Sequence, residues 1–199
     1  MNTNDIEFFG DMDIIRKRLA TLDSNFFETI YNKDSWYIKA QDLFSAANVL
    51  KTSIQQELNN RLKNESASLK IMLDSTNLSS SYMLLVGFAL ENFLKGIFIA
   101  REPHNQESLN KMFRLSHNLN DLADHLEIEK TENEKEILTR LTKYTIWDGR
   151  YPTPSQKKEK EFSSSRGIFL YNIDFKIIEG LVKKLEAEFY GFEEDLYIT

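Results

Sequence analysis

Apolar residues recur at intervals of three and four along most of this chain, which is the spacing of one face of an α-helix. The longest stripe runs from Trp36 to Leu62, and Asp34 or Ser35 can cap the start of that helix. Shorter apolar stripes predict further helices over residues 6–22, 107–113, 118–126, 131–147 and 174–190. The pattern therefore predicts helix over most of the sequence.

The most apolar stretch covers residues 78–100 and is interrupted near its centre by Glu91, Asn92 and Lys95. A membrane span and a central core helix both fit its length. Charged side chains at the centre of a span cost several kcal/mol in lipid, whereas a helix that is apolar all round is otherwise a core helix. We therefore expect a buried helix that ends before Pro103, and no contact with a membrane.

No segment has a convincing strand pattern, and the best candidate, residues 167–171, is short and isolated. Thr131 and Glu134 fit the S/T-x-x-E capping box that opens a helix. We predict an all-α fold, an antiparallel helical bundle of about five to seven helices. Because no linker rich in Ser, Gly or Pro divides the chain, residues 1–199 read as one domain, in which N-terminal helices within residues 1–65 extend the bundle.

Composition narrows the classes of function. The 199 residues include no cysteine, which excludes disulfide frameworks, thiolate zinc sites and cysteine nucleophiles. A formal charge of −6 argues against a broad surface that coats nucleic acid, but it leaves room for a local basic patch. No positively charged start leads into an apolar run near Met1, so we expect no secretory signal and a cytoplasmic location.

The three histidines do not have the spacing of a metal site. His117 and His125 are eight residues apart, too far for a pair on one helix face, and His104 lies in a different loop. The H-E-x-x-H motif, Walker-type phosphate loops and dinucleotide fingerprints are all absent from the sequence. We expect no metal and no cofactor, with His117 capping the next helix and His125 on a helix surface.

Glu91 and Lys95 are four residues apart on the most apolar helix, so they can pair on one of its faces. Two interpretations remain open. The pair is either part of a solvated stripe, which is the commoner case, or it faces a polar pocket, where ionisable groups are often functional.

The segment from Trp147 to Pro154 is the most unusual part of the sequence, because two of the three prolines lie in it. Gly149 suits the left-handed position after a helix end, and Tyr151 is extended because it precedes a proline. Arg150, beside aromatic residues on a rigid turn, can bind a phosphate bidentately. Alternatively, Arg150 caps carbonyl groups or pairs with a neighbouring acid.

Charge is unevenly distributed along the C-terminal part of the chain. Residues 150–166 hold five basic and two acidic side chains, whereas residues 183–199 hold two basic and five acidic ones. The basic segment is either a polyanion contact or a solvated stretch. The predicted loop over residues 148–172 is long for a compact domain, and such loops are either functional or disordered.

Three motifs, in this order, resemble those of the HEPN superfamily of small all-α domains. They are FALENFLKG at residues 88–96, HNLNDL at residues 117–122 and WDGRYP at residues 147–152. In that family an A-x-E-x-x-L-K helix precedes an H-x-L-x-x-L helix, and some branches carry an R-Y-P turn. The resemblance covers residues 82–154, and the last predicted helix fits the family's closing helix.

The resemblance implies an antiparallel helical bundle that often dimerises. Members act as RNases in toxin–antitoxin and phage-defence systems, or as partners of minimal nucleotidyltransferases. The RNase branch has an Arg followed by a His after four to six residues, but the corresponding positions after Arg150 are Ser155, Gln156 and Lys157. The imidazole that would act as general acid and base is therefore missing from its usual place.

Three hypotheses follow. The first is a non-catalytic HEPN-like module, a homodimer that binds RNA, a nucleotide, or a nucleotidyltransferase or antitoxin partner. Its expected ligand-binding residues are Arg150, Tyr151, Trp147, Glu91 and Lys95. The second is a metal-independent RNase that uses Arg150 with His117. The third is a structural helical protein in which Arg150 lies in an internal ion pair.

Overall fold

The computed structural model describes residues 28–63, 78–115, 117–148 and 172–195. In these ranges the chain is all-α and contains no strand. The elements are α2 (Lys33–Lys63), α4 (Leu78–Arg101), α5 (Gln106–Leu115), α6 (Leu119–His125), α7 (Glu132–Lys143), the π-helical turn η1 (Tyr144–Asp148) and α9 (Asn172–Asp195). The predicted all-α fold is confirmed.

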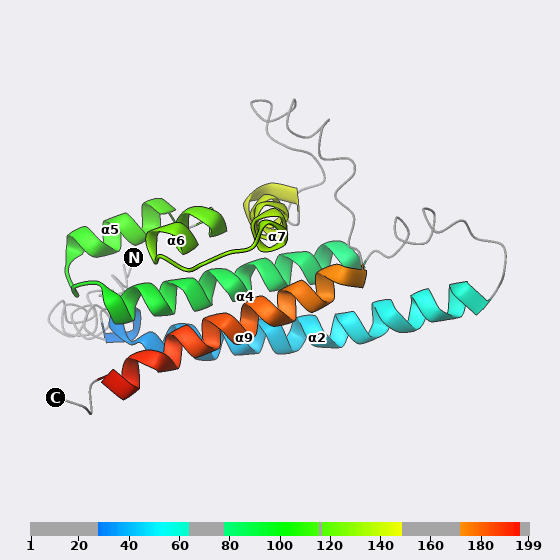
Figure 1. The fold of residues 1–199 in the computed structure, drawn as a ribbon, viewed down its shortest axis with the longest axis horizontal. Coiled ribbons are helices and arrows are strands. Elements are labelled where there is room, and N and C mark those ends of the chain that lie inside the picture. Colours follow the sequence, from blue (N-terminus) through cyan, green and yellow to red (C-terminus); the bar gives the residue numbers. More distant parts are fainter. Residues whose placement is uncertain (1–27, 64–77, 116, 149–171, 196–199) are drawn as a thin grey trace, which may run out of the picture.

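Helix α4 lies at the centre of an antiparallel bundle (Figure 1). Helix α2 runs beside it in the opposite direction and makes its most extensive contact, while α9 packs against α4 and runs in the same direction as α4. Helices α6 and α7 contact α4 as well, α7 also packs against α9, and α5 contacts α6 (Figure 1). The predicted helical bundle is thus observed, with α2 antiparallel to both α4 and α9.

Helix α4 supplies much of the hydrophobic core. Its Phe93, Leu94, Ile97 and Phe98 are almost completely buried. By length and composition alone α4 could cross a membrane, but 72% of its most apolar window is buried inside the protein. Such burial is typical of a core helix, because other helices cover its apolar sides.

Two helix starts differ from the prediction. The cap of α2 is Asn32, whose side-chain oxygen accepts from the backbone N–H of Asp34 at 2.9 Å, so neither Asp34 nor Ser35 is the capping residue. The cap of α6 is Asn118 and not His117. In both places a short asparagine side chain reaches the free N–H groups of the first helical turn.

The predicted capping box of α7 is confirmed. The Thr131 hydroxyl accepts from the Glu134 N–H at 3.3 Å, and the Glu134 carboxylate accepts from the Thr131 N–H at 2.8 Å. Lys184 of α9 also donates to both oxygens of this carboxylate. Although burial acts to raise the pKa of Glu134, the hydrogen bonds from Lys184 and Thr131 outweigh it and hold that pKa below its ordinary value.

A second polar link joins α7 to α9. Arg140 donates through both terminal nitrogens to the fully buried carboxylate of Asp174, at 2.8 and 2.7 Å. A bidentate pair of this kind fixes direction as well as distance. Together with the bond from Lys184 to Glu134, it sets the register of α9 along the bundle.

Two glycines in α4 allow close helix contacts. A Cβ atom at Gly87 would lie 2.5 Å from Cγ2 of Thr145 in η1, and one at Gly96 would lie 3.2 Å from Cβ of Trp36 in α2. Both neighbours belong to elements packed against α4, so the absence of a side chain sets how closely they approach. The helix predicted over residues 131–147 is observed as two consecutive elements, the α-helix α7 and the π-helical turn η1.

Some predictions fall outside the described residues. They are the helix over residues 6–22, the candidate strand over residues 167–171 and the left-handed position of Gly149.

Candidate functional site

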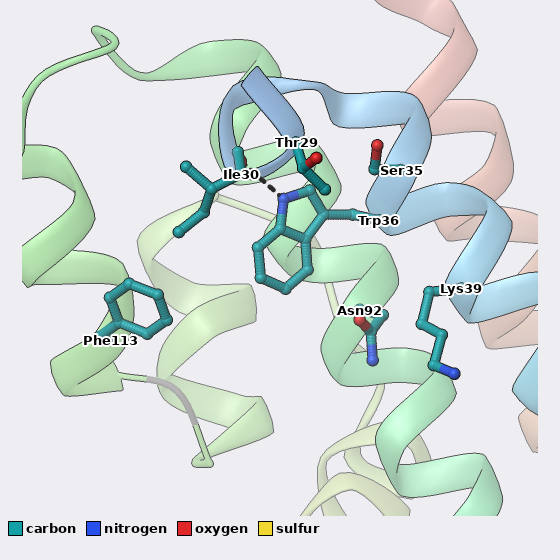
Figure 2. A pocket seen from close by; sticks show the side chains of 7 residues that line it. All are labelled: Thr29, Ile30, Ser35, Trp36, Lys39, Asn92 and Phe113. Carbon is teal, nitrogen blue, oxygen red and sulfur yellow. Dashed lines mark hydrogen bonds between the residues drawn. The ribbon is translucent and has the colours of Figure 1, made fainter. Parts of the chain in front are cut away.

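A pocket of about 370 Å³ opens where α2, α4 and α5 meet (Figure 2). Its surface is mainly apolar, with a few polar groups, which is typical of small-molecule sites in this range of volumes. Two of its residues come from the segment before α2, three from α2, and one each from α4 and α5. They are Thr29, Ile30, Ser35, Trp36, Lys39, Asn92 and Phe113.

Two aromatic rings face the pocket from different helices. The indole N–H of Trp36 donates to the carbonyl oxygen of Ile30 at 2.8 Å, which fixes the ring at the start of α2. Phe113 of α5 is 48% exposed, unusually high for such a large apolar side chain. In Figure 2 the two rings lie across an open space from each other. This arrangement suits a flat or apolar group inserted between them.

Polar groups of the pocket come from α2 and α4. The exposed side chain of Lys39 supplies a positive charge. The side-chain amide of Asn92 donates to the carbonyl oxygen of Phe88 at 2.7 Å, which orients its own oxygen as an acceptor. The pocket therefore offers one cation and one oriented acceptor around an apolar interior.

The predicted pair of Glu91 and Lys95 lies beside this pocket and is buried. Lys95 Nζ donates to Glu91 Oε1 at 2.7 Å, and the two side chains are only 9% and 6% exposed. The ammonium lies 5.5 Å from the ring centroid of Trp36 and 5.8 Å from that of Phe113. The interpretation of these residues as a solvated stripe is therefore wrong, because α2 and α5 cover this face of α4.

His117 completes the polar cluster from a third element, the turn between α5 and α6. Its Nδ1 lies 3.4 Å from Glu91 Oε2, and half of its side chain is exposed. The turn is held in place because Asn118 caps α6 and the backbone N–H of Leu119 donates to the Thr142 hydroxyl at 3.1 Å. A buried carboxylate thus contacts a cation on one side and an accessible imidazole on the other.

The other two histidines, His104 and His125, contact residues that do not line the pocket. His104 stacks on Tyr31 with ring centroids 4.9 Å apart. His125 contacts the carboxylate of Glu102 at 2.8 Å and packs against Phe98. The expectation of an ordinary surface histidine at position 125 is therefore wrong, since its side chain is partly buried in an ion-pair network. Among the described residues no group of three His, Asp or Glu side chains could hold a metal ion.

The predicted turn around Arg150 lies outside the described residues, as does Tyr151. Trp147 belongs to η1 by its backbone, and its side chain is not described. Of the predicted binding residues, the structure thus brings together Glu91 and Lys95, with His117 beside them.

Sequence reasoning missed the pocket-lining residues Trp36, Lys39, Asn92 and Phe113. In the sequence Trp36 opens a long apolar stripe and Phe113 is the last residue of a short predicted helix, and these two helices are far apart along the chain. One signal for Asn92 was available in the sequence. It directly follows Glu91, so two adjacent polar residues interrupt an otherwise apolar helix, and it lies one turn after Phe88.

A second, wider hollow of about 700 Å³ lies along α5. It shares Phe113 with the pocket and is lined by Glu107, Asn110, Phe113 and Arg114. Phe113 therefore borders both hollows, and Arg114 supplies a positive charge to the second one.

Comparisons of the chain with models of protein families, with curated proteins and with solved structures find no match. The similarity to the HEPN superfamily therefore rests on the three sequence motifs.

Proposed function

We propose that this chain is a HEPN-like nucleotide-binding module, which holds one base of a nucleotide or of single-stranded RNA in the pocket between Trp36 and Phe113. The observation that carries the proposal is the pair of aromatic rings on either side of an apolar pocket with Lys39 beside it. In this role the module binds its ligand without catalysing a reaction.

Stacking on aromatic rings is the usual way in which proteins hold unpaired bases, because every base has an aromatic face. Cations nearby then neutralise the phosphate groups. Lys39 lines the pocket, and Arg114 lines the hollow that shares Phe113 with it. A footprint of one or two nucleotides is compatible with a chain of formal charge −6, whereas a broad nucleic-acid surface is not.

Arg150 and Tyr151 remain part of this proposal on sequence grounds. The basic segment 150–166 carries five basic and two acidic side chains in a chain of formal charge −6. We propose that Arg150 contributes a phosphate contact, that the module is a homodimer, and that it serves a toxin–antitoxin or phage-defence system in which a nucleotidyltransferase or antitoxin is its partner. Arg150→Ala should then weaken binding without changing the melting temperature.

Calorimetry and tryptophan fluorescence test the binding site directly. Ribonucleoside monophosphates and a short single-stranded RNA should release or absorb heat on mixing and should quench the emission of Trp36. Trp36→Phe should remove the quench that arises in the pocket, and any quench that remains then comes from Trp147, the second of the two tryptophans and the neighbour of Arg150 in the sequence. Phe113→Ala should weaken binding about ten-fold, because one stacking surface is lost.

The matched control is Val49→Ala, which removes an exposed apolar side chain from α2 at a position outside the pocket lining. This variant should bind like the wild type. Absence of both heat and quenching with every probe at millimolar concentration would overturn the proposed function.

A metal-independent RNase is the second candidate, and the contact between His117 and Glu91 favours it. A carboxylate 3.4 Å from Nδ1 can orient an exposed imidazole so that it removes a proton from a ribose 2′-hydroxyl. The 2′-oxygen would attack the adjacent phosphorus, and the 5′-oxygen would leave with a proton. Labelled RNA incubated with EDTA should be cleaved by the wild type and not by His117→Ala or Arg150→Ala, and an inactive wild type removes this candidate.

A further inference from the structure

The pocket lies where an apolar segment of the same chain joins the described fold. Thr29 and Ile30 line the pocket, and the described residues begin at Glu28, so residues 1–27 are attached directly at the pocket. The sequence predicts an amphipathic helix over residues 6–22 of this segment. Its apolar stripe consists of Phe8, Phe9, Met12, Ile15, Leu19 and Leu22.

A short amphipathic helix of this kind needs a surface against which to bury its apolar stripe. A helix of four or five turns is only marginally stable alone in water, and most of its stability comes from packing of the apolar face. The chain from Leu22 to Glu28 is six residues long, so it spans at most about 20 Å. A tether this short gives an effective concentration in the millimolar range, at which even weak docking fills a nearby site.

The pocket suits the part of the stripe that lies closest to it along the chain. Ile15, Leu19 and Leu22 are spaced by four and three residues, so they share one face of the predicted helix. The pocket of about 370 Å³ is mainly apolar, and since a cavity of about 150 Å³ holds a benzene molecule, it has room for two aliphatic side chains. Its exposed Phe113 offers apolar surface that such side chains would cover.

We propose that residues 6–22 dock on the pocket through Ile15, Leu19 and Leu22 and act as an intramolecular competitor that a ligand must displace. The competition rests on the proposed nucleotide-binding function, whereas the docking does not. Because the segment and a base would cover the same aromatic rings, the affinity measured for a ligand is its intrinsic affinity multiplied by the fraction of molecules in which the pocket is open.

Disulfide trapping in the full chain tests the docking, because the sequence contains no cysteine and two introduced thiols react only with each other. Leu19→Cys/Lys39→Cys places the second thiol in the pocket lining, and Leu19→Cys/Ile38→Cys places it on the neighbouring residue, which is exposed outside the lining. A disulfide needs Cα atoms within about 7 Å, so with oxidised glutathione the first pair should close about ten-fold faster. Equal rates, or a product that joins two chains, would overturn the inference and leave the proposed function standing.

Calorimetry with adenosine monophosphate tests the competition. Leu19→Asp puts a charge on the docking face, which should release the segment and tighten nucleotide binding about ten-fold if the segment fills the pocket nine-tenths of the time. The matched control is Thr21→Asp, which adds the same charge outside the apolar stripe and should bind like the wild type. Unchanged affinity in Leu19→Asp would overturn the inference. If neither the wild type nor Leu19→Asp binds the nucleotide, the proposed function and the competition both fall, and the trapping rates alone decide the docking.

Discussion

Removing one partner of the buried ion pair should destabilise the protein far more than removing both. Lys95→Met leaves the carboxylate of Glu91 buried, with only the half-exposed His117 beside it. Glu91→Leu leaves the ammonium of Lys95 among aromatic rings without its carboxylate. Glu91→Leu/Lys95→Met places two apolar side chains of similar length on a helix face that α2 and α5 already cover.

The magnitude follows from burial. Because the two side chains are 9% and 6% exposed, the solvent cannot screen a lone charge at either position. An unpaired buried charge costs about 3–5 kcal/mol, whereas exchanging the whole pair for apolar residues is often neutral or stabilising. Domains have a total free energy of unfolding of about 5–15 kcal/mol, so each single variant should lose a large part of it. The remaining contact with His117 should make Lys95→Met the milder of the two.

Urea denaturation followed by circular dichroism measures the effect. With a slope of about 2 kcal/mol per molar urea, a loss of 4 kcal/mol lowers the midpoint by about 2 M. The double variant should return close to the wild-type midpoint, which gives a large favourable coupling in the double-mutant cycle. Single variants within about 0.5 M of the wild type, or a double variant as unstable as the two single losses added together, would refute the reasoning.

Three further outcomes follow from the packing. Gly87→Ala should lower stability by about 1–3 kcal/mol in the same urea assay, because its Cβ would lie 2.5 Å from Thr145, and backbone and π-turn must shift. Gly180→Ala, in an exposed position of α9 with no atom within 4 Å of the added Cβ, should instead raise stability by up to about 1 kcal/mol. Since the pKa of Glu134 is lowered in the folded state, its bond to Lys184 stabilises the fold above the ordinary carboxyl pKa of 4.5 and is lost as pH falls through the lowered value. A pH series of urea midpoints should therefore show less acid destabilisation in Glu134→Gln than in the wild type.

The helices could be predicted well because each carries its own periodic apolar stripe. The stripes of α2, α4 and α9 placed the three long helices, and Thr131 with Glu134 marked the start of α7. The starts of α2 and α6 were placed less well, since several neighbouring polar residues could cap each of them. The residue that caps the helix depends on the path of the turn before it, and the local sequence pattern does not show that path.

The candidate site was predictable only in part. Glu91 and Lys95 could be singled out because charged residues interrupt an apolar helix. Whether they were solvated or buried could not, because burial depends on Trp36 and Phe113, which approach from helices distant in sequence. Sequence spacing describes neighbours along one helix, and the pocket arises where three helices meet.

The two aromatic rings of the pocket belong to helices that differ in local stability. Trp36 belongs to the long helix α2, whereas Phe113 belongs to the ten-residue helix α5, which is anchored in the core mainly through Leu109 and Met112. Short helices of this kind open locally at a lower free energy than the core does. A ligand between the two rings would have to be released before α5 could open, so occupancy would slow hydrogen exchange of the α5 amides. A bound ligand would then stabilise this end of the bundle against local opening.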